Sequence, residues 1–214
     1  MADETMFVRS LVVQAVDAAA QLIASDPVAA RWDRPSSLEA MSVGALSAHL
    51  VRAAGSTLAY LDRTDPLAVP DDELLTPVTY FHAALDSPIH DQIKDVSAQE
   101  ATAGHHAVAA KCQSVCTELA RRLPNEPEDR LVGALGGRML TLDDFCRTRL
   151  IEMLLHIDDL ASSVGMEPPP TDPAGFDIVI ETIIGIARLV HGDRAVLVGL
   201  ARAERSSGTI FPVL

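Results

Sequence analysis

Four long stretches of this sequence repeat apolar residues every three or four positions, which is the spacing of an amphipathic helix. The first stretch shows the pattern most fully, with apolar side chains on one face from Phe7 to Leu22. Elements of this length bury their apolar stripes most simply by packing against one another as a four-helix bundle. The expected helices cover residues 4–24, 42–62, 97–123 and 141–164.

Polar residues at the ends of these stretches supply start and stop signals. Ser42 and Thr141 each stand where a helix N-cap is expected. Ser97-Ala-Gln-Glu100 has the spacing of a capping box and predicts the start of the third helix. Gly165 is expected to end the fourth helix, because glycine adopts the left-handed conformation of a C-cap at little cost.

The segments between these helices are short or rich in proline. Residues 63–96 contain four prolines and predict a loop with one short helix at Val78–Leu85. Two short apolar runs around Gly136-Gly137 predict a β-hairpin within residues 131–140.

A proline-rich stretch, Glu167–Gly175, separates the bundle from a small C-terminal segment. The expected domains are therefore residues 1–166, the helical bundle, and residues 174–214, a small α+β segment. In this segment we expect a helix over Ala174–Val190, followed by a hairpin formed by Ala195–Ala201 and Thr209–Leu214. The predicted fold class is mainly α, a four-helix bundle followed by a small α+β tail.

Charge and composition exclude several classes of partner. The chain of 214 residues has a formal net charge of −13, and no basic stripe offsets it, so nucleic acid and anionic membrane surfaces are not expected partners. Three cysteines without framework spacing, and no recognisable targeting or membrane-spanning segment, predict a cytoplasmic protein. The apolar helix faces are compatible with a monomer or a homodimer.

The fourth helix carries the residues with the clearest chemical potential. Arg149, Glu152, His156 and Asp159 fall on one stripe of this helix. A Glu and a His four residues apart project side by side and can hold one metal ion between them. The same spacing also suits an ordinary Glu–His hydrogen bond on a solvated face, so the spacing alone does not establish a metal site.

His49, on the second helix, adds a third potential ligand. A lone histidine among apolar and small residues is most often a core residue bonded to a backbone carbonyl. However, nitrogen and oxygen ligands from two facing helices also suit a divalent metal with one open position, which is typical of a catalytic site.

At these residues the sequence resembles a known family. Trp32, Pro35 and Ser36 precede a helix with a Leu-x-x-His-Leu string, and about a hundred residues later comes Arg-x-x-Glu-x-x-x-His-x-x-Asp-Leu. This ordered set is similar to the mycothiol-dependent maleylpyruvate isomerase family, whose N-terminal domain is a DinB-like metal-binding four-helix bundle. The strings occupy Leu46 to Leu50 and Arg149 to Leu160.

The resemblance implies that His49, Glu152 and His156 are ligands of a divalent metal, with zinc as the expected ion. It also implies a low-molecular-weight thiol such as mycothiol as cofactor, and isomerisation or conjugation of a small electrophile as the reaction. A hydrolase in which water takes the place of the thiol, or a non-catalytic metal- or ligand-binding protein, is the alternative.

Two further residues on the stripe have open roles. Arg149 could bind a substrate carboxylate or pair with an acid such as Asp159. Asp159 could orient His156, or it could be a plain surface residue. The remaining candidates are expected to be core or surface residues rather than ligands: Cys112, Cys116, Cys146, His82, His90, His105, His106 and the acidic run 71–73.

Overall fold

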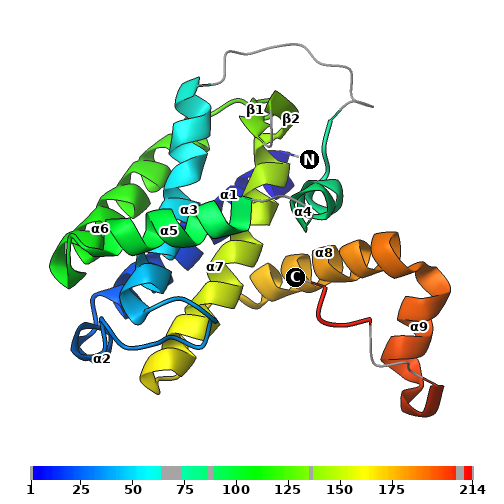
Figure 1. The fold of residues 1–214 in the computed structure, drawn as a ribbon. Coiled ribbons are helices and arrows are strands. Elements are labelled where there is room, and N and C mark those ends of the chain that lie inside the picture. The colour runs from blue at the N-terminus through cyan, green and yellow to red at the C-terminus, as the bar shows by residue number, and fades with distance from the viewer. Residues whose placement is uncertain (1, 64–73, 86–88, 135–136, 206–209, 214) are drawn as a thin grey trace.

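The computed structural model describes residues 2–63, 74–85, 89–134, 137–205 and 210–213, and in these the chain is mainly helical (Figure 1). The fold class predicted from sequence, mainly α, is confirmed. In chain order the elements are α1 (Ala2–Ile23), α2 (Asp26–Ala30), α3 (Val43–Arg63), α4 (Pro77–Leu85), α5 (Ile89–Ala101), α6 (His105–Arg122), η2 (Leu123–Asn125), β1 (Leu131–Ala134), β2 (Arg138–Thr141), α7 (Leu142–Val164), α8 (Pro173–His191), α9 (Asp193–Ala201) and η4 (Ala203–Arg205).

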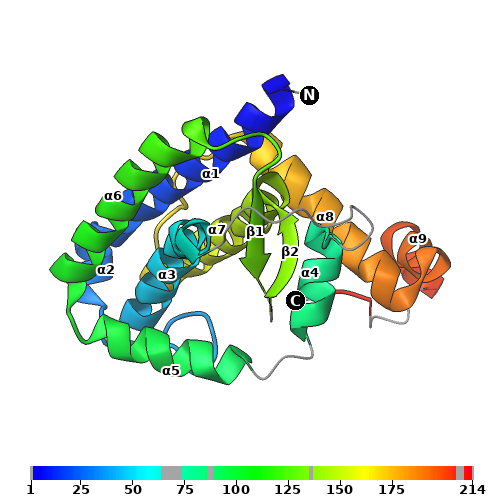
Figure 2. The same cartoon turned by 90° about the horizontal axis from the view of Figure 1, so that it is seen from above.

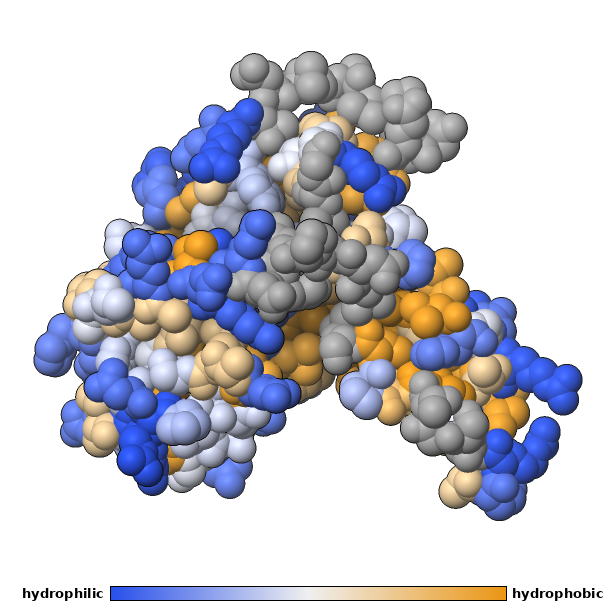
Figure 3. Space-filling view, in the orientation of Figure 1, coloured by the Kyte–Doolittle hydropathy of each residue, from blue (hydrophilic) through white to orange (hydrophobic). Residues whose placement is uncertain are grey.

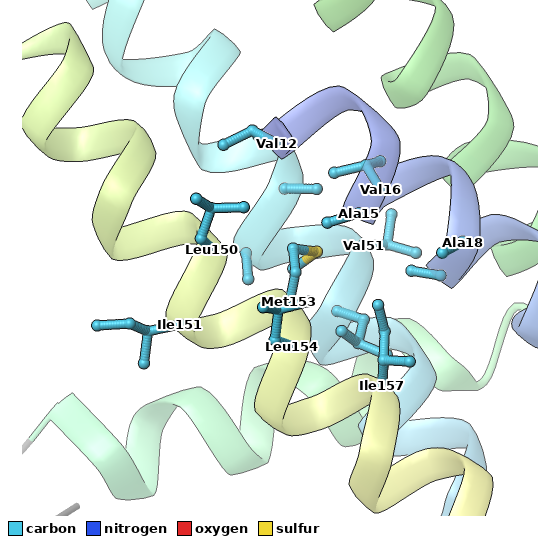
Figure 4. Close-up of a cluster of buried hydrophobic side chains, with 14 of the residues drawn as sticks. Val12, Ala15, Val16, Ala18, Val51, Leu150, Ile151, Met153, Leu154 and Ile157 are labelled. Carbon is cyan, nitrogen blue, oxygen red and sulfur yellow. The ribbon is translucent and has the colours of Figure 1, made fainter. Parts of the chain in front are cut away.

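The core forms where α1, α3 and α7 meet. Val12 from α1, Val51 from α3 and Met153 from α7 lie together in it, and each is at most 2% exposed (Figure 4). Seen from above, α6 runs beside α1 on the outside of the bundle (Figure 2). Burial of these apolar stripes stabilises the bundle, at about 25 cal/mol for each Å² removed from water.

The predicted N-caps of α3 and α7 and the predicted C-cap of α7 are confirmed. The Ser42 hydroxyl accepts from the Ala45 amide at 3.0 Å, and the Thr141 hydroxyl accepts from the Asp144 amide at 3.0 Å. Gly165 takes a left-handed conformation, with φ of 70°, and ends α7. These caps determine where α3 and α7 begin and where α7 ends.

The predicted hairpin is also present. Strands β1 and β2 pair antiparallel, with Leu131 opposite Thr141 and Ala134 opposite Arg138. Val132 and Leu140 are fully buried against the bundle. Because β2 leads directly into α7, the hairpin anchors the first turn of that helix.

The predicted capping box at Ser97 is wrong. Ser97 lies inside α5, fully buried, and its hydroxyl has no hydrogen-bond partner among the described residues. Residues 89–101 form a separate helix, so the region before Ser97 is helical rather than a loop. The third bundle helix, α6, starts at His105 after Gly104, whose φ of 86° allows the chain to turn between α5 and α6.

The predicted strand at Ala195–Ala201 is also wrong, because these residues belong to helix α9. A short apolar run cannot be assigned to helix or strand from its hydropathy alone. Here Gly192, with φ of 82°, ends α8 and lets the chain turn into a second helix. The expected second strand, residues 209–214, lies partly outside the described residues, and its described part, residues 210–213, forms no strand.

Helices α8 and α9 extend from one side of the bundle (Figures 1 and 2). Apolar side chains gather over α8 where it faces the viewer in Figure 3. No helix among the described residues is both long and apolar enough to cross a membrane. The large apolar residues that stay exposed on α8 and α9 are Phe176, Ile180, Leu189, Val190, Leu197 and Leu200.

The start of α3 is packed so closely that a single methyl group should disturb it. A Cβ added at Gly44 would lie 2.6 Å from the Trp32 ring. We therefore expect Gly44→Ala to lower the free energy of unfolding by about 1–3 kcal/mol, the usual cost of overpacking. On the same helix, a Cβ added at Gly55 would lie 3.7 Å from the nearest atom, a methyl carbon of Val115, which is an ordinary van der Waals distance. Gly55→Ala should therefore leave the free energy of unfolding unchanged or raise it by up to about 1 kcal/mol. Urea unfolding of both variants measures the difference, and equal stabilities would contradict the prediction.

Candidate metal centre

Three side chains with ligand atoms meet between α3 and α7. His49 comes from the second turn of α3, and Glu152 and His156 come from one face of α7. Their ligand atoms all lie within 4.8 Å of one another, and this is the only such group of three or more found in the part of the chain that the structure describes. Two helices about a hundred residues apart in sequence thus bring together the residues singled out above.

The geometry places the Glu152 carboxylate between the two imidazoles. Its Oε2 lies 3.3 Å from His49 Nε2 and 3.5 Å from His156 Nε2. The two rings meet edge to face, with centroids 4.8 Å apart. The three side chains are 13–21% exposed, so the cluster is sheltered but reachable from solvent.

The donor set fits a divalent ion. Two imidazole nitrogens and one carboxylate oxygen are a ligand combination found at catalytic zinc, with a further position left for water or substrate. Asp159 Oδ2 lies 2.9 Å from His156 Nδ1, on the side of the ring away from Glu152. Such an outer carboxylate fixes which ring nitrogen faces the ion. His49 Nδ1 is buried and has no partner among the described residues.

Electrostatics favour the charged forms of both α7 ligands. Burial opposes ionisation of Glu152, but hydrogen bonds from His156 and His49 and the Arg149 charge outweigh it and hold the pKa of Glu152 well below its usual range. Burial likewise opposes the protonated form of His156. Hydrogen bonds to Asp159 and Glu152 prevail and raise the pKa of His156 to about 9.

Arg149 lies one turn before Glu152 on α7 and is only 6% exposed. It does not pair with Asp159, which instead bonds His156. The guanidinium lies over the Phe145 ring at 4.6 Å from the centroid and donates to three hydroxyls, those of Thr148, Ser56 and Tyr80.

Tyr80 and Ser56 were not singled out by sequence reasoning. Tyr80 lies on the short helix α4, and its place beside Arg149 depends on long-range packing that no local pattern reveals. Burial is the main cause of a raised Tyr80 pKa, partly offset by the Arg149 charge.

The cysteines are core residues, as predicted. Cys112, Cys116 and Cys146 are buried and free, and burial raises the pKa of both Cys112 and Cys146 to about 12. His105 Nε2 lies 2.7 Å from the Ile23 carbonyl oxygen, so this histidine serves the bundle and does not join the cysteines in a metal site.

The other weak candidates give no further site. His82 and His106 are exposed, as expected for surface residues. The side chain of His90 and the acidic run 71–73 lie outside the described residues.

Fold and site together define a helical-bundle protein with a candidate two-histidine, one-glutamate metal site between two of its long helices. Residues 12–161 match the family model described as the mycothiol maleylpyruvate isomerase N-terminal domain, and the chain belongs to this family. No curated protein and no solved structure matches the chain significantly.

Proposed function

We propose that this protein is a metal-dependent enzyme that uses a low-molecular-weight thiol, such as mycothiol, to isomerise or conjugate a small electrophile. The observation that carries the proposal is the convergence of His49, Glu152 and His156 within 4.8 Å. Membership of a family named for mycothiol and maleylpyruvate isomerase supports the thiol and the reaction class.

In this proposal His49, Glu152 and His156 would hold a divalent ion, with zinc as the expected metal. When bound, such an ion lowers the pKa of a thiol that ligates it, so that the sulfur is nucleophilic at neutral pH. Glu152 contributes a carboxylate that is already ionised. Asp159 holds the His156 ring by its Nδ1 atom, which leaves Nε2 directed at the centre.

The thiol accounts for either of two outcomes. Addition of its sulfur to an electrophilic double bond leaves a single bond about which the adduct can rotate. Elimination then returns the thiol and gives the isomer, whereas a stable adduct is the product of a transferase. Arg149, one turn from Glu152, is the residue that we propose to contact the substrate.

The metal site is tested by replacing both histidines. Purified wild-type protein reconstituted with zinc is expected to contain about one zinc per chain, and His49→Ala/His156→Ala is expected to contain essentially none, because one carboxylate alone binds zinc weakly. Mass spectrometry of the metal content is the measurement. His191→Ala, at the exposed end of α8, is the matched control and should retain the metal. Equal zinc content in the double variant would refute the site.

The thiol requirement is tested on the metal-loaded protein. Turnover of a panel of small electrophiles should require added mycothiol and should be absent in the double variant. Hydrolysis of small esters or amides without any thiol would instead support the hydrolase. A protein that binds zinc but neither binds thiol nor turns over substrate would be a non-catalytic metal-binding member.

A further inference from the structure

Helices α8 and α9 carry most of the large apolar side chains that stay exposed to solvent. Together these helices form an arm that extends from one side of the bundle (Figures 1 and 2). Among the described residues, ten large hydrophobic side chains are exposed; six of them belong to this arm, and each of the six is 43–67% exposed. Apolar surface gathered in this way on a soluble domain is typical of an interaction site.

The first apolar patch of the arm has acidic neighbours. On α8, Phe176 and Ile180 are four residues apart and therefore lie on one face of the helix. Asp177 and Glu181 each follow one of these residues, so they border the same face. Both acids are exposed, and neither has a basic partner among the described residues. These four residues are called the α8 patch.

The second apolar patch has a basic neighbour. On α9, Leu197 and Leu200 are three residues apart and share a face, and Arg194 lies three residues before Leu197 on that same face. The Arg194 side chain is exposed and has no acidic partner in the part of the chain that the structure describes. These three residues are called the α9 patch. Within one chain the two patches do not cover each other, because the apolar residues of both stay exposed.

The arm is also nearly neutral, unlike the rest of the chain. Residues 172–205 contain five acidic residues and four arginines, whereas the whole chain has a net charge of −13. Two copies of the chain therefore repel each other over most of their surfaces, but hardly at all where two arms meet. Complementary patches on one chain can both be covered in a two-fold dimer, because each copy then offers one patch to the other.

We propose that the arm is the dimerisation surface of this protein, with the α8 patch of each copy packed against the α9 patch of its partner. The four apolar side chains of the two patches expose on the order of 100 Å² each, about 400 Å² in all. A stable interface buries roughly 800 Å² per partner, of which somewhat more than half is apolar. The two patches therefore supply nearly all the apolar surface that such a dimer needs.

The first test measures the mass of the purified 214-residue chain by sedimentation velocity across the micromolar range. We expect the wild type to reach twice the 22.8 kDa of one chain. Ile180→Glu should stay monomeric, because it places a charge in the apolar contact. Val96→Glu is the matched control, since Val96 is an exposed apolar residue of α5, outside the arm, and this variant should dimerise as the wild type does. A wild type that is monomeric throughout, or a dimer that persists in Ile180→Glu, would overturn the proposal.

The second test exchanges the charges that border the two patches. Glu181→Arg and Arg194→Glu should each weaken the dimer by about 10- to 100-fold, because each places like charges opposite one another at both symmetric contacts. The double variant Glu181→Arg/Arg194→Glu should recover most of the affinity, since opposite charges face each other again. A double variant that dimerises no better than the weaker single variant would overturn the pairing of α8 with α9. Circular dichroism confirms that each variant is folded, and all four substituted positions are exposed.

Discussion

Arg9→Met is expected to lower the free energy of unfolding by about 3–5 kcal/mol, the usual cost of breaking a buried ion pair from one side. Arg9 is 1% exposed, and its Nε donates to Asp143 Oδ1 at 2.7 Å. Its other nitrogens donate to the Leu123, Glu126 and Pro127 carbonyls at 3.1, 2.7 and 2.9 Å. One side chain of α1 therefore ties the first turn of α7 to the segment that follows α6. Methionine would leave all four acceptors without this donor.

Urea unfolding followed by circular dichroism measures the effect. Arg121→Met is the matched control, because Arg121 pairs with Glu118 on the exposed face of α6 and its side chain is 69% exposed. This pair is exposed and screened by water, so Arg121→Met should leave the free energy of unfolding close to that of the wild type. A decrease of less than about 1 kcal/mol in the free energy of unfolding of Arg9→Met would contradict the prediction. It would show that water readily replaces the guanidinium as hydrogen-bond donor.

Zinc affinity should fall about tenfold for each pH unit between 8.5 and 6.5, about a hundredfold in all. The physical cause is competition with a proton. The pKa of His156 is raised to about 9, so below that pH the metal-free protein holds a proton on a ring that must be neutral to bind zinc. With an ordinary histidine pKa of 6.5, affinity would be nearly constant over the same range. Competition with a chromophoric chelator at several pH values measures the slope.

Asp159→Asn provides the internal check on this prediction. Two carboxylates raise the pKa of His156 through hydrogen bonds, and that of Asp159 has the larger effect. The zinc affinity of the variant should therefore depend less steeply on pH. Its zinc affinity at pH 8.5 should also fall about 10- to 100-fold, since the ring loses its outer partner. The exposed neighbour gives the control, and Asp158→Asn should behave as the wild type does. An equal slope in Asp159→Asn and wild type would show that Asp159 does not set the proton competition.

The long helices could be predicted because their apolar spacing and their caps agree. Helix α7 is the clearest example, bounded by Thr141 and by Gly165. The failures occurred where a local signal was ambiguous. The Ser97–Glu100 spacing matches a capping box, yet these residues form the last turns of α5 against α3, and the real helix start follows Gly104.

Only part of the candidate site could be predicted from local sequence spacing. The spacing of Glu152 and His156 follows from helix geometry, but the position of His49 opposite them depends on how α3 packs against α7. The resemblance to the family supplied that pairing. Tyr80 could not be anticipated, because its contact with Arg149 joins a short helix to a long one across 69 positions of the sequence.

Helix α4 lies within the residues that match the family model, but it packs against α8, which lies beyond the matched residues. A Cβ at Gly185 would meet the Val78 side chain at 2.7 Å, so α8 supports the turn of α4 that carries Tyr80. In evolutionary terms, positions 78 and 185 should covary among related proteins, with a larger residue at one position accompanied by a smaller residue at the other. Recombination that exchanged the C-terminal helices for unrelated ones would therefore also alter the surroundings of Arg149.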